Sequence, residues 1–92
     1  MKTTSLTIII PAFNEEAAIS QVVVRLAESF SKTELIVVAD GSRDSTAQLA
    51  VEAGATVICH RKNQGYGAAL RSGIKRSKRD YVLFCDAENI GC

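Results

Sequence analysis

The sequence has few of the residues that define many specialised small proteins. Among its 92 residues are one proline, one histidine and no tryptophan, and only 5% are aromatic. The three cysteines, Cys59, Cys85 and Cys92, form no CxxC pair and leave an odd number. This argues against a disulfide framework and favours a reducing compartment, in which the cysteines serve mainly as small hydrophobic residues.

A zinc site is equally unsupported. His60 is the single histidine, and Cys59 beside it does not provide a ligand set of the usual spacing. We therefore interpret His60 as a structural residue.

A strong excess of one charge and long apolar runs are also missing. The 11 basic and 10 acidic residues give a net charge of +1, which provides no global reason to expect nucleic-acid or membrane binding. The apolar run at 6–10 is too short for a signal peptide, and no run reaches the length of a membrane span. We expect a cytoplasmic protein.

What remains is the composition of one globular domain over residues 1–92, with 47% hydrophobic and 23% charged residues. A chain of this length buries only about 60–65% of the surface that its unfolded form exposes, so we expect marginal stability.

Hydrophobic periodicity predicts alternating strands and helices. Strands are expected at 6–10, 35–39, 56–59 and 81–85, and those at 6–10, 35–39 and 81–85 are expected to be buried. One helix is expected after a cap at Asn14 with core positions up to Phe30, a second from a cap at Asp44 or Ser45 through 53, and a third over 68–77. The order βαβαβαβ predicts a Rossmann-like α/β fold, with a parallel sheet and helices on both faces.

Ligands of such sheets bind beyond the carboxyl ends of the strands, and here three of the four strand ends carry carboxylates. A phosphate-binding loop would place glycine amides after the first strand, but Pro11 stands there and no GxxxxGK[ST] motif occurs. Acidic strand ends instead suit a divalent cation that bridges to a diphosphate. Asp86 and Glu88 are the candidate ligands for Mg²⁺ or Mn²⁺.

Four segments of the chain form a recognisable series: IIPAFNEE at 9–16, IVVADGSRDST at 36–46, NQGYGAALRSG at 63–73 and DYVLFCDAE at 80–88. In this order they resemble family 2 glycosyltransferases of GT-A fold, particularly dolichyl-phosphate mannose synthases and polyprenyl-phosphate sugar transferases. The resemblance covers nearly the whole chain.

The resemblance implies a role for each matching residue. Asp40 would accept hydrogen bonds from the base or ribose, Asp86 and Glu88 would form a DxD-type metal motif, and the nucleotide-sugar pocket would be lined by Pro11, Ala12, Phe13 and Glu15. Simpler interpretations remain open. Asn14, Glu15 and Glu16 could merely cap a helix, 40–42 could be a plain turn, and the acids at 86 and 88 could be solvated loop residues.

Two positions depart from the family pattern. Ala39 stands where a second aspartate is usual, and Glu88 stands where aspartate is commoner. The chain also ends soon after the acidic motif, so we expect the fold to be incomplete at its C-terminus and the acceptor site and catalytic base to lie elsewhere. The catalytic base is therefore unassigned, and we expect the isolated chain to be inactive and prone to association through its open edge.

The stretch 61–79 contains seven basic residues and no acid. Arg71, Lys75 and Lys78 would share one helical face, which could meet anionic lipid headgroups or a lipid phosphate, or could simply be solvated. We expect Arg71 to lie near the donor diphosphate.

The expected function is therefore the donor-binding part of a metal-dependent glycosyltransferase. The donor would be a GDP- or UDP-sugar and the candidate acceptor a polyprenyl or dolichyl phosphate, at the cytoplasmic face of a membrane. A non-catalytic nucleotide-binding module and an inactive truncated fragment are the alternatives.

Overall fold

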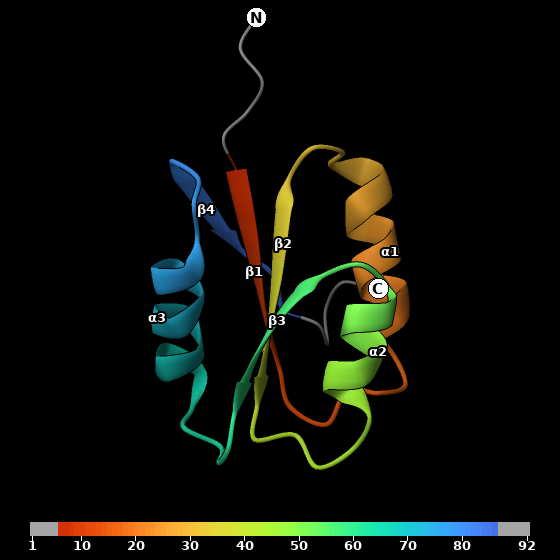
Figure 1. Cartoon of the computed structure of the whole chain (residues 1–92), viewed down its shortest axis with the longest axis vertical. Coiled ribbons are helices and arrows are strands. Elements are labelled where there is room, and N and C mark those ends of the chain that lie inside the picture. Colours follow the sequence, from red (N-terminus) through yellow and green to blue (C-terminus); the bar gives the residue numbers. More distant parts are fainter. Residues whose placement is uncertain (1–5, 87–92) are drawn as a thin grey trace, which may run out of the picture.

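The computed structural model describes residues 6–86, which form four strands and three helices in the predicted order βαβαβαβ (Figure 1). The strands are β1 (Leu6–Ala12), β2 (Glu34–Asp40), β3 (Thr56–His60) and β4 (Tyr81–Phe84). The helices are α1 (Ile19–Ser29), α2 (Thr46–Glu52) and α3 (Tyr66–Arg76).

The strands form one parallel sheet in the order β3-β2-β1-β4, and their arrows all run toward the same end (Figure 1). The chain first moves outward from β1 to β2 and β3, and then crosses back to place β4 on the other side of β1. The direction of winding therefore reverses between the neighbouring strands β1 and β4, and the switch point of the sheet lies at their carboxyl ends.

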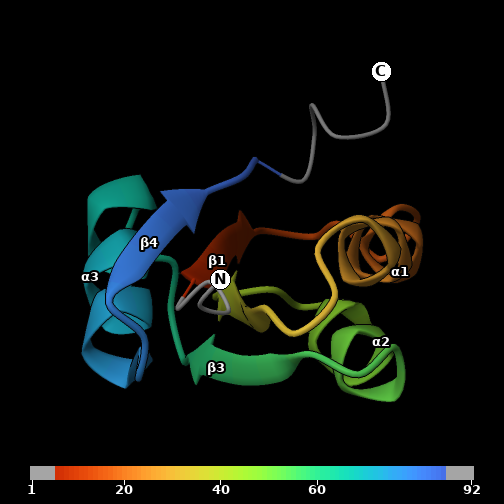
Figure 2. The ribbon, with the colours of Figure 1, turned by 90° about the horizontal axis from the view of Figure 1, so that it is seen from above.

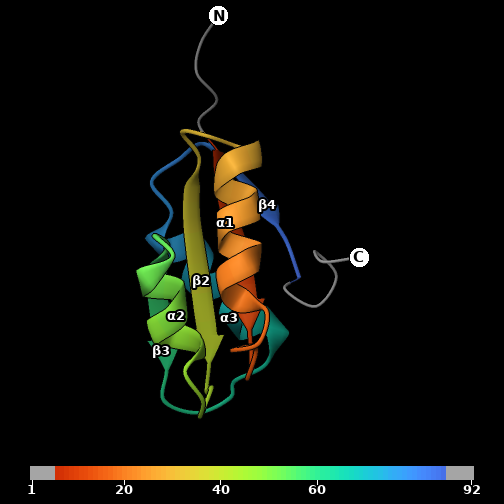
Figure 3. The ribbon, with the colours of Figure 1, turned by 90° about the vertical axis from the view of Figure 1, so that its right-hand side faces the viewer.

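Helices cover both faces of the sheet, as the sequence predicts. Helices α1 and α2 lie on one side and α3 on the other, which Figures 2 and 3 show from two directions. Side chains of β1 alternate between the two layers because successive residues of a strand point to opposite faces. Ile8 and Ile10 join the core under α1 and α2, whereas Ile9 packs with Ala69 of α3.

The first helix begins later than predicted. Asn14 does not cap it, because α1 starts at Ile19 after Ala18, and no side chain caps that end. Asn14 instead has a positive φ of 52° and accepts a hydrogen bond from the backbone N–H of Arg43. The third helix differs in the opposite direction, since it starts at Tyr66, before the predicted residue 68.

Strand β1 continues through Pro11. The carbonyl of Ile9 accepts a hydrogen bond from the amide of Cys85, which follows the end of β4. Alternate residues of a strand direct their backbone groups to the same neighbouring strand, so the nitrogen of Pro11 also lies on the β4 side. The pairing with β4 ends at Ile9, so Pro11 interrupts no hydrogen bond of the ladder.

The prediction that the fourth strand is buried is wrong: in the structure formed by the described residues 6–86, strand β4 is exposed. Strand β4 lies at an edge of the sheet with β1 as its neighbour, and all four of its residues are exposed. The exposed fraction is 68% for Tyr81 and 42% for Phe84. An apolar run alone cannot distinguish a central strand from an edge strand, because strand order is set by the crossovers.

No helix within the described part of the chain is long and apolar enough to span a membrane.

Candidate functional site

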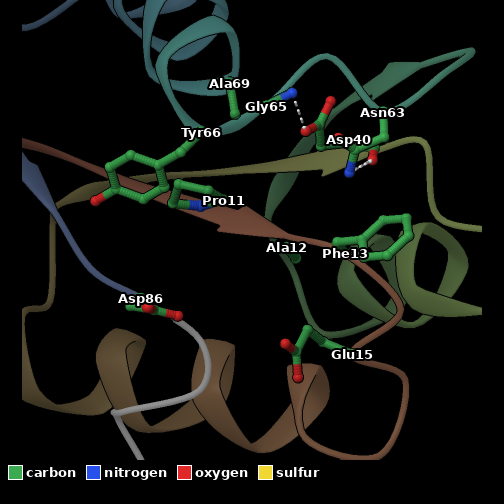
Figure 4. A pocket seen from close by; sticks show the side chains of 10 residues that line it. All are labelled: Pro11, Ala12, Phe13, Glu15, Asp40, Asn63, Gly65, Tyr66, Ala69 and Asp86. Carbon is green, nitrogen blue, oxygen red and sulfur yellow. Dashed lines mark hydrogen bonds between the residues drawn. The ribbon is translucent and has the colours of Figure 1, made fainter.

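A pocket of about 240 Å³ opens at the carboxyl ends of the strands, next to the switch point (Figure 4). Segments that are far apart in the sequence supply its wall: the end of β1 and the loop after it, the end of β2, the loop between β3 and α3, the start of α3, and the residue Asp86 after β4. The lining residues are Pro11, Ala12, Phe13, Glu15, Asp40, Asn63, Gly65, Tyr66, Ala69 and Asp86.

Six of the residues singled out from the sequence lie in this lining: Pro11, Ala12, Phe13, Glu15, Asp40 and Asp86. One other described residue, Arg71, does not lie there. It is exposed on α3, and its Nη1 lies 3.4 Å from the position that a Cβ on Gly67 would take. Glu88 lies outside the described residues.

Sequence reasoning did not assign the other four lining residues, Asn63, Gly65, Tyr66 and Ala69. Asn63 and Gly65 belong to the loop that follows β3. Their place just after the carboxyl end of a parallel strand could have indicated them, because ligands of such sheets bind there. Tyr66, which is 57% exposed, gave no comparable signal because an isolated aromatic residue at a helix start has many uses.

Asp40 ends β2 and is nearly buried, with 5% of the residue exposed. Its carboxylate accepts hydrogen bonds from the amides of Gln64 at 2.8 Å and Gly65 at 2.9 Å. Its Oδ1 also lies 2.7 Å from Nδ1 of His60. Burial raises the pKa of Asp40, but the bonds from Gln64, His60 and Gly65 outweigh it, so the pKa lies below its ordinary value and the group is ionised at neutral pH.

His60 continues this chain of hydrogen bonds. Its Nε2 lies 2.7 Å from Oγ of Ser72 in α3, while its Nδ1 contacts Asp40. The ring therefore connects the ends of β2 and β3 with the helix that covers them. This placement agrees with the structural role expected from the sequence.

The loop that carries Phe13 and Glu15 is fixed by the loop between β2 and α2. Oγ1 of the buried Thr46 accepts a hydrogen bond from the amide of Glu15 at 2.8 Å, and Thr46 also bonds to Asp44. The other contacts pair the Asn14 amide with Ser42, the Arg43 amide with Asn14, the Glu16 amide with Asp44 and the Ser45 amide with Glu16. Much of the 40–46 segment thus holds the adjacent loop in place.

Asp86 follows β4 and faces the pocket across from Asp40 (Figure 4). Glu15 lies on the same side of the pocket as Asp86. Carboxylate oxygens are the ligands that Mg²⁺ and Mn²⁺ prefer. Residues 6–86 contain no group of three histidine, cysteine or acidic side chains that could enclose an ion. An ion held through one or two carboxylates, with substrate phosphates and water completing its shell, fits this arrangement better than a closed protein cage.

The pocket also offers apolar surface. Pro11 and the buried Ala69 lie on one side, and the half-exposed ring of Phe13 lies at the end of β1 (Figure 4). The pocket thus combines an apolar surface, which suits a flat ring with polar edges, with a carboxylate side, which suits a diphosphate bound through a cation.

The model of the family described as "Glycosyl transferase family 2" matches residues 7–90. The uncharacterized protein MJ1222 of Methanocaldococcus jannaschii is 41% identical over 74% of this chain and 28% of its own length. An undecaprenyl-phosphate 4-deoxy-4-formamido-L-arabinose transferase of Pseudomonas fluorescens is 33% identical over 89% of this chain and 27% of its own length.

Solved structures share the fold. Glucosyl-3-phosphoglycerate synthase from Mycobacterium tuberculosis, in complex with Mg²⁺ and uridine diphosphate, matches with a TM-score of 0.79 and 29% identity over 91% of this chain and 33% of that one. The mannosyltransferase PcManGT from Pyrobaculum calidifontis, in complex with GDP-Man and Mn²⁺, matches in fold with a TM-score of 0.85 and 22% identity, over 95% of this chain and 28% of that one. The chain thus spans about a quarter to a third of the length of these proteins.

Proposed function

Because the chain belongs to glycosyl transferase family 2, we propose that it forms the donor-binding part of an enzyme that transfers a sugar from a nucleotide-sugar to an acceptor. The observation that carries this proposal is the pocket at the switch point, which gathers Glu15, Asp40 and Asp86 from three different strand ends. The GT-A fold predicted from the sequence supports the same function.

We propose that the nucleoside of a UDP- or GDP-sugar binds against Pro11, Ala12 and Phe13. Similar structures hold uridine diphosphate in one case and GDP-Man in the other, which supports both donor classes. The carboxylate of Asp40 would have room for about one further hydrogen bond from the base or ribose. Its carboxylate already receives three hydrogen bonds, and a carboxylate offers about four acceptor positions.

A divalent cation fits the other side of the pocket. Asp86 would hold Mg²⁺ or Mn²⁺ there, and Glu88, two residues further along the sequence, is the proposed second ligand. When bound, the cation supplies positive charge that stabilises the leaving nucleoside diphosphate. The chain's own contribution is to orient Asp86 from β4 and to keep the nucleoside side of the pocket apolar.

The acceptor is a separate proposal. The Pseudomonas relative is named for transfer to undecaprenyl phosphate, which supports a lipid-phosphate acceptor. The exposed basic residues of α3, including Lys75 and Arg76 in its last turn, would suit an anionic headgroup surface. The expectation that Arg71 contacts the donor diphosphate stays a prediction, as does the location at the cytoplasmic face of a membrane.

Calorimetry with UDP and with GDP, each in the presence of Mn²⁺ or of EDTA, tests the donor and metal roles together. We expect measurable binding with Mn²⁺ and strongly weakened binding with EDTA. The Asp86→Asn variant should lose the metal-dependent part of the affinity. Glu28→Gln, which removes a similar charge from an exposed position near the end of α1, is the matched control and should bind as the unmodified chain does.

Equal affinity with Mn²⁺ and with EDTA would contradict the metal role of Asp86. Binding of both nucleotides without any turnover, in a protein that extends over the length of its relatives, would favour the non-catalytic alternative.

A further inference from the structure

We infer that His60 is a positioning residue for nucleotide binding, because it fixes the carboxylate of Asp40 on which one wall of the donor pocket is built. The inference rests on the proposed function for its consequence, and on the hydrogen bonds among residues 40, 60, 63–65 and 72 for its geometry. His60 does not line the pocket, so it acts through Asp40 rather than on the ligand.

His60 and Asp40 are neighbours by strand register, since the two residues pair directly at the ends of β3 and β2. The distance from Nδ1 to Oδ1 is 2.7 Å, and the exposed fractions of the two side chains are 8% and 7%. Ser72 contacts the other ring nitrogen at 2.7 Å. The imidazole is thus held at both ends, between two strands and a helix.

Asp40 in turn holds the loop between β3 and α3. Its carboxylate receives the amides of Gln64 and Gly65, and its backbone carbonyl receives Nδ2 of Asn63 at 3.1 Å. Asn63 and Gly65 line the donor pocket, and Tyr66, which also lines it, begins α3 directly afterwards. The position of this wall therefore depends on where the Asp40 carboxylate points.

The three donors to that carboxylate are not equivalent. The amides of Gln64 and Gly65 belong to the loop that is being positioned, so they move with it. His60 belongs to a strand of the sheet, and it is the donor that ties the carboxylate to the rigid part of the fold. Removing it would leave the carboxylate and the loop to settle together in more than one arrangement.

The geometry also assigns the proton on the ring. An ionised carboxylate can only accept, so Nδ1 of His60 must carry the hydrogen, and the hydroxyl of Ser72 can then donate to Nε2. Since His60 is the one histidine in the chain, its ring signals can be assigned without ambiguity.

Two substitutions separate positioning from packing. His60→Asn keeps an N–H donor near the place of Nδ1, whereas His60→Leu fills a similar volume without any donor. We expect His60→Leu to bind UDP or GDP with Mn²⁺ about tenfold more weakly or worse, and His60→Asn to stay within about threefold of the unmodified chain. Cys59→Ala, at the exposed neighbouring position, is the control and should change nothing.

Nucleotide affinity equal to the unmodified chain in His60→Leu would overturn the inference. So would equal losses in the Leu and Asn variants, because rescue by a donor is what distinguishes positioning from packing.

Nitrogen-15 NMR of the ring and the loop gives a second test that does not depend on nucleotide binding. We expect the neutral ring to carry its proton on Nδ1, and the Gln64 and Gly65 amides to be protected from exchange in the unmodified chain and in His60→Asn but not in His60→Leu. A proton on Nε2 of the neutral ring, or equal protection in all three proteins, would overturn the inference. A chain that binds neither UDP nor GDP would end the proposed function instead, and these spectra would still decide the role of His60.

Discussion

Replacing Gly41 by alanine should damage the site far more than its size suggests. Gly41 follows Asp40 with a φ of +78°, and a Cβ built on it would lie 2.2 Å from the backbone nitrogen of Asn63 and 2.7 Å from the carbonyl carbon of Lys62. These neighbours are backbone atoms, which cannot rotate away as the end of a flexible side chain can. The loop after β3 would have to move by roughly 1 Å to reach ordinary contact.

The size of the effect follows from what the loop is attached to. A non-glycine residue with this φ costs about 1–2 kcal/mol. Displacing the loop would also break the bonds from Gln64 and Gly65 to the Asp40 carboxylate, and bonds to a charged acceptor contribute about 1.5–3 kcal/mol each. The total of about 4–8 kcal/mol is a large part of the roughly 5–14 kcal/mol that a domain of this length has.

Gly54→Ala is the matched control, because Gly54 also has a positive φ of +106° but, apart from its two chain neighbours, no residue comes within 4 Å of its Cβ position. Urea denaturation of the two variants should therefore differ by about 3–6 kcal/mol, the part that arises from loop displacement. If the free energy of unfolding of the two variants agrees within about 1 kcal/mol, the loop is not packed on Gly41 and the reasoning fails.

Three further changes test other parts of the structure. Thr46→Val should lower the free energy of unfolding by about 2–3 kcal/mol in urea denaturation, because it leaves the amide of Glu15 without its acceptor, whereas Thr56→Val in β3 should change it by less than about 0.5 kcal/mol. Burial raises the pKa of Glu34, but the hydrogen bonds from Thr7 and Lys78 and the nearby Arg79 and Lys78 charges outweigh it, so the pKa is lowered. Stability from this group should be present above the ordinary carboxyl pKa and be lost as the pH falls through the lowered value. Glu34→Gln should accordingly flatten the loss of stability between neutral and acid pH in denaturation curves, and an unchanged slope would contradict this. Phe13→Ala should weaken UDP or GDP binding about tenfold in calorimetry if the ring contacts the base, and unchanged affinity would remove it from the nucleoside site.

The sequence predicts most of the fold because its signals are local. Runs such as 6–10 and 35–39 combine β-branched residues with short length, and the helical segments repeat their apolar residues at helical spacing. Helix starts were harder. Asn14 has the chemistry of a cap, but a partner 29 residues away, the Arg43 amide, takes its side-chain oxygen. Such a competition between local and distant partners is decided only in three dimensions.

The site was predictable to the extent that it follows from topology. Parallel strands bring their carboxyl ends together, so Pro11, Asp40 and Asp86 were expected near one another, and the pocket lining contains all three. What the sequence could not reveal is how Asp40 is used. Its contacts with His60 and the loop amides join residues that are 20 to 25 positions apart, and no spacing pattern marks them.

The place of β4 in the sheet also has a consequence for how the protein folds. The adjacent pairing of β1 with β2 and of β2 with β3 needs only the first two crossovers, whereas β4 must return to β1, and the Ser77 hydroxyl reaches Thr7 across 70 residues. Closing so long a loop is entropically expensive and slow compared with local pairing. We therefore expect the side of the pocket formed by β1 and β2, the proposed nucleoside site, to form early, while the side that carries Asp86 is completed last. During synthesis, the chain would acquire the proposed surface for the base before the carboxylate that we propose as a metal ligand.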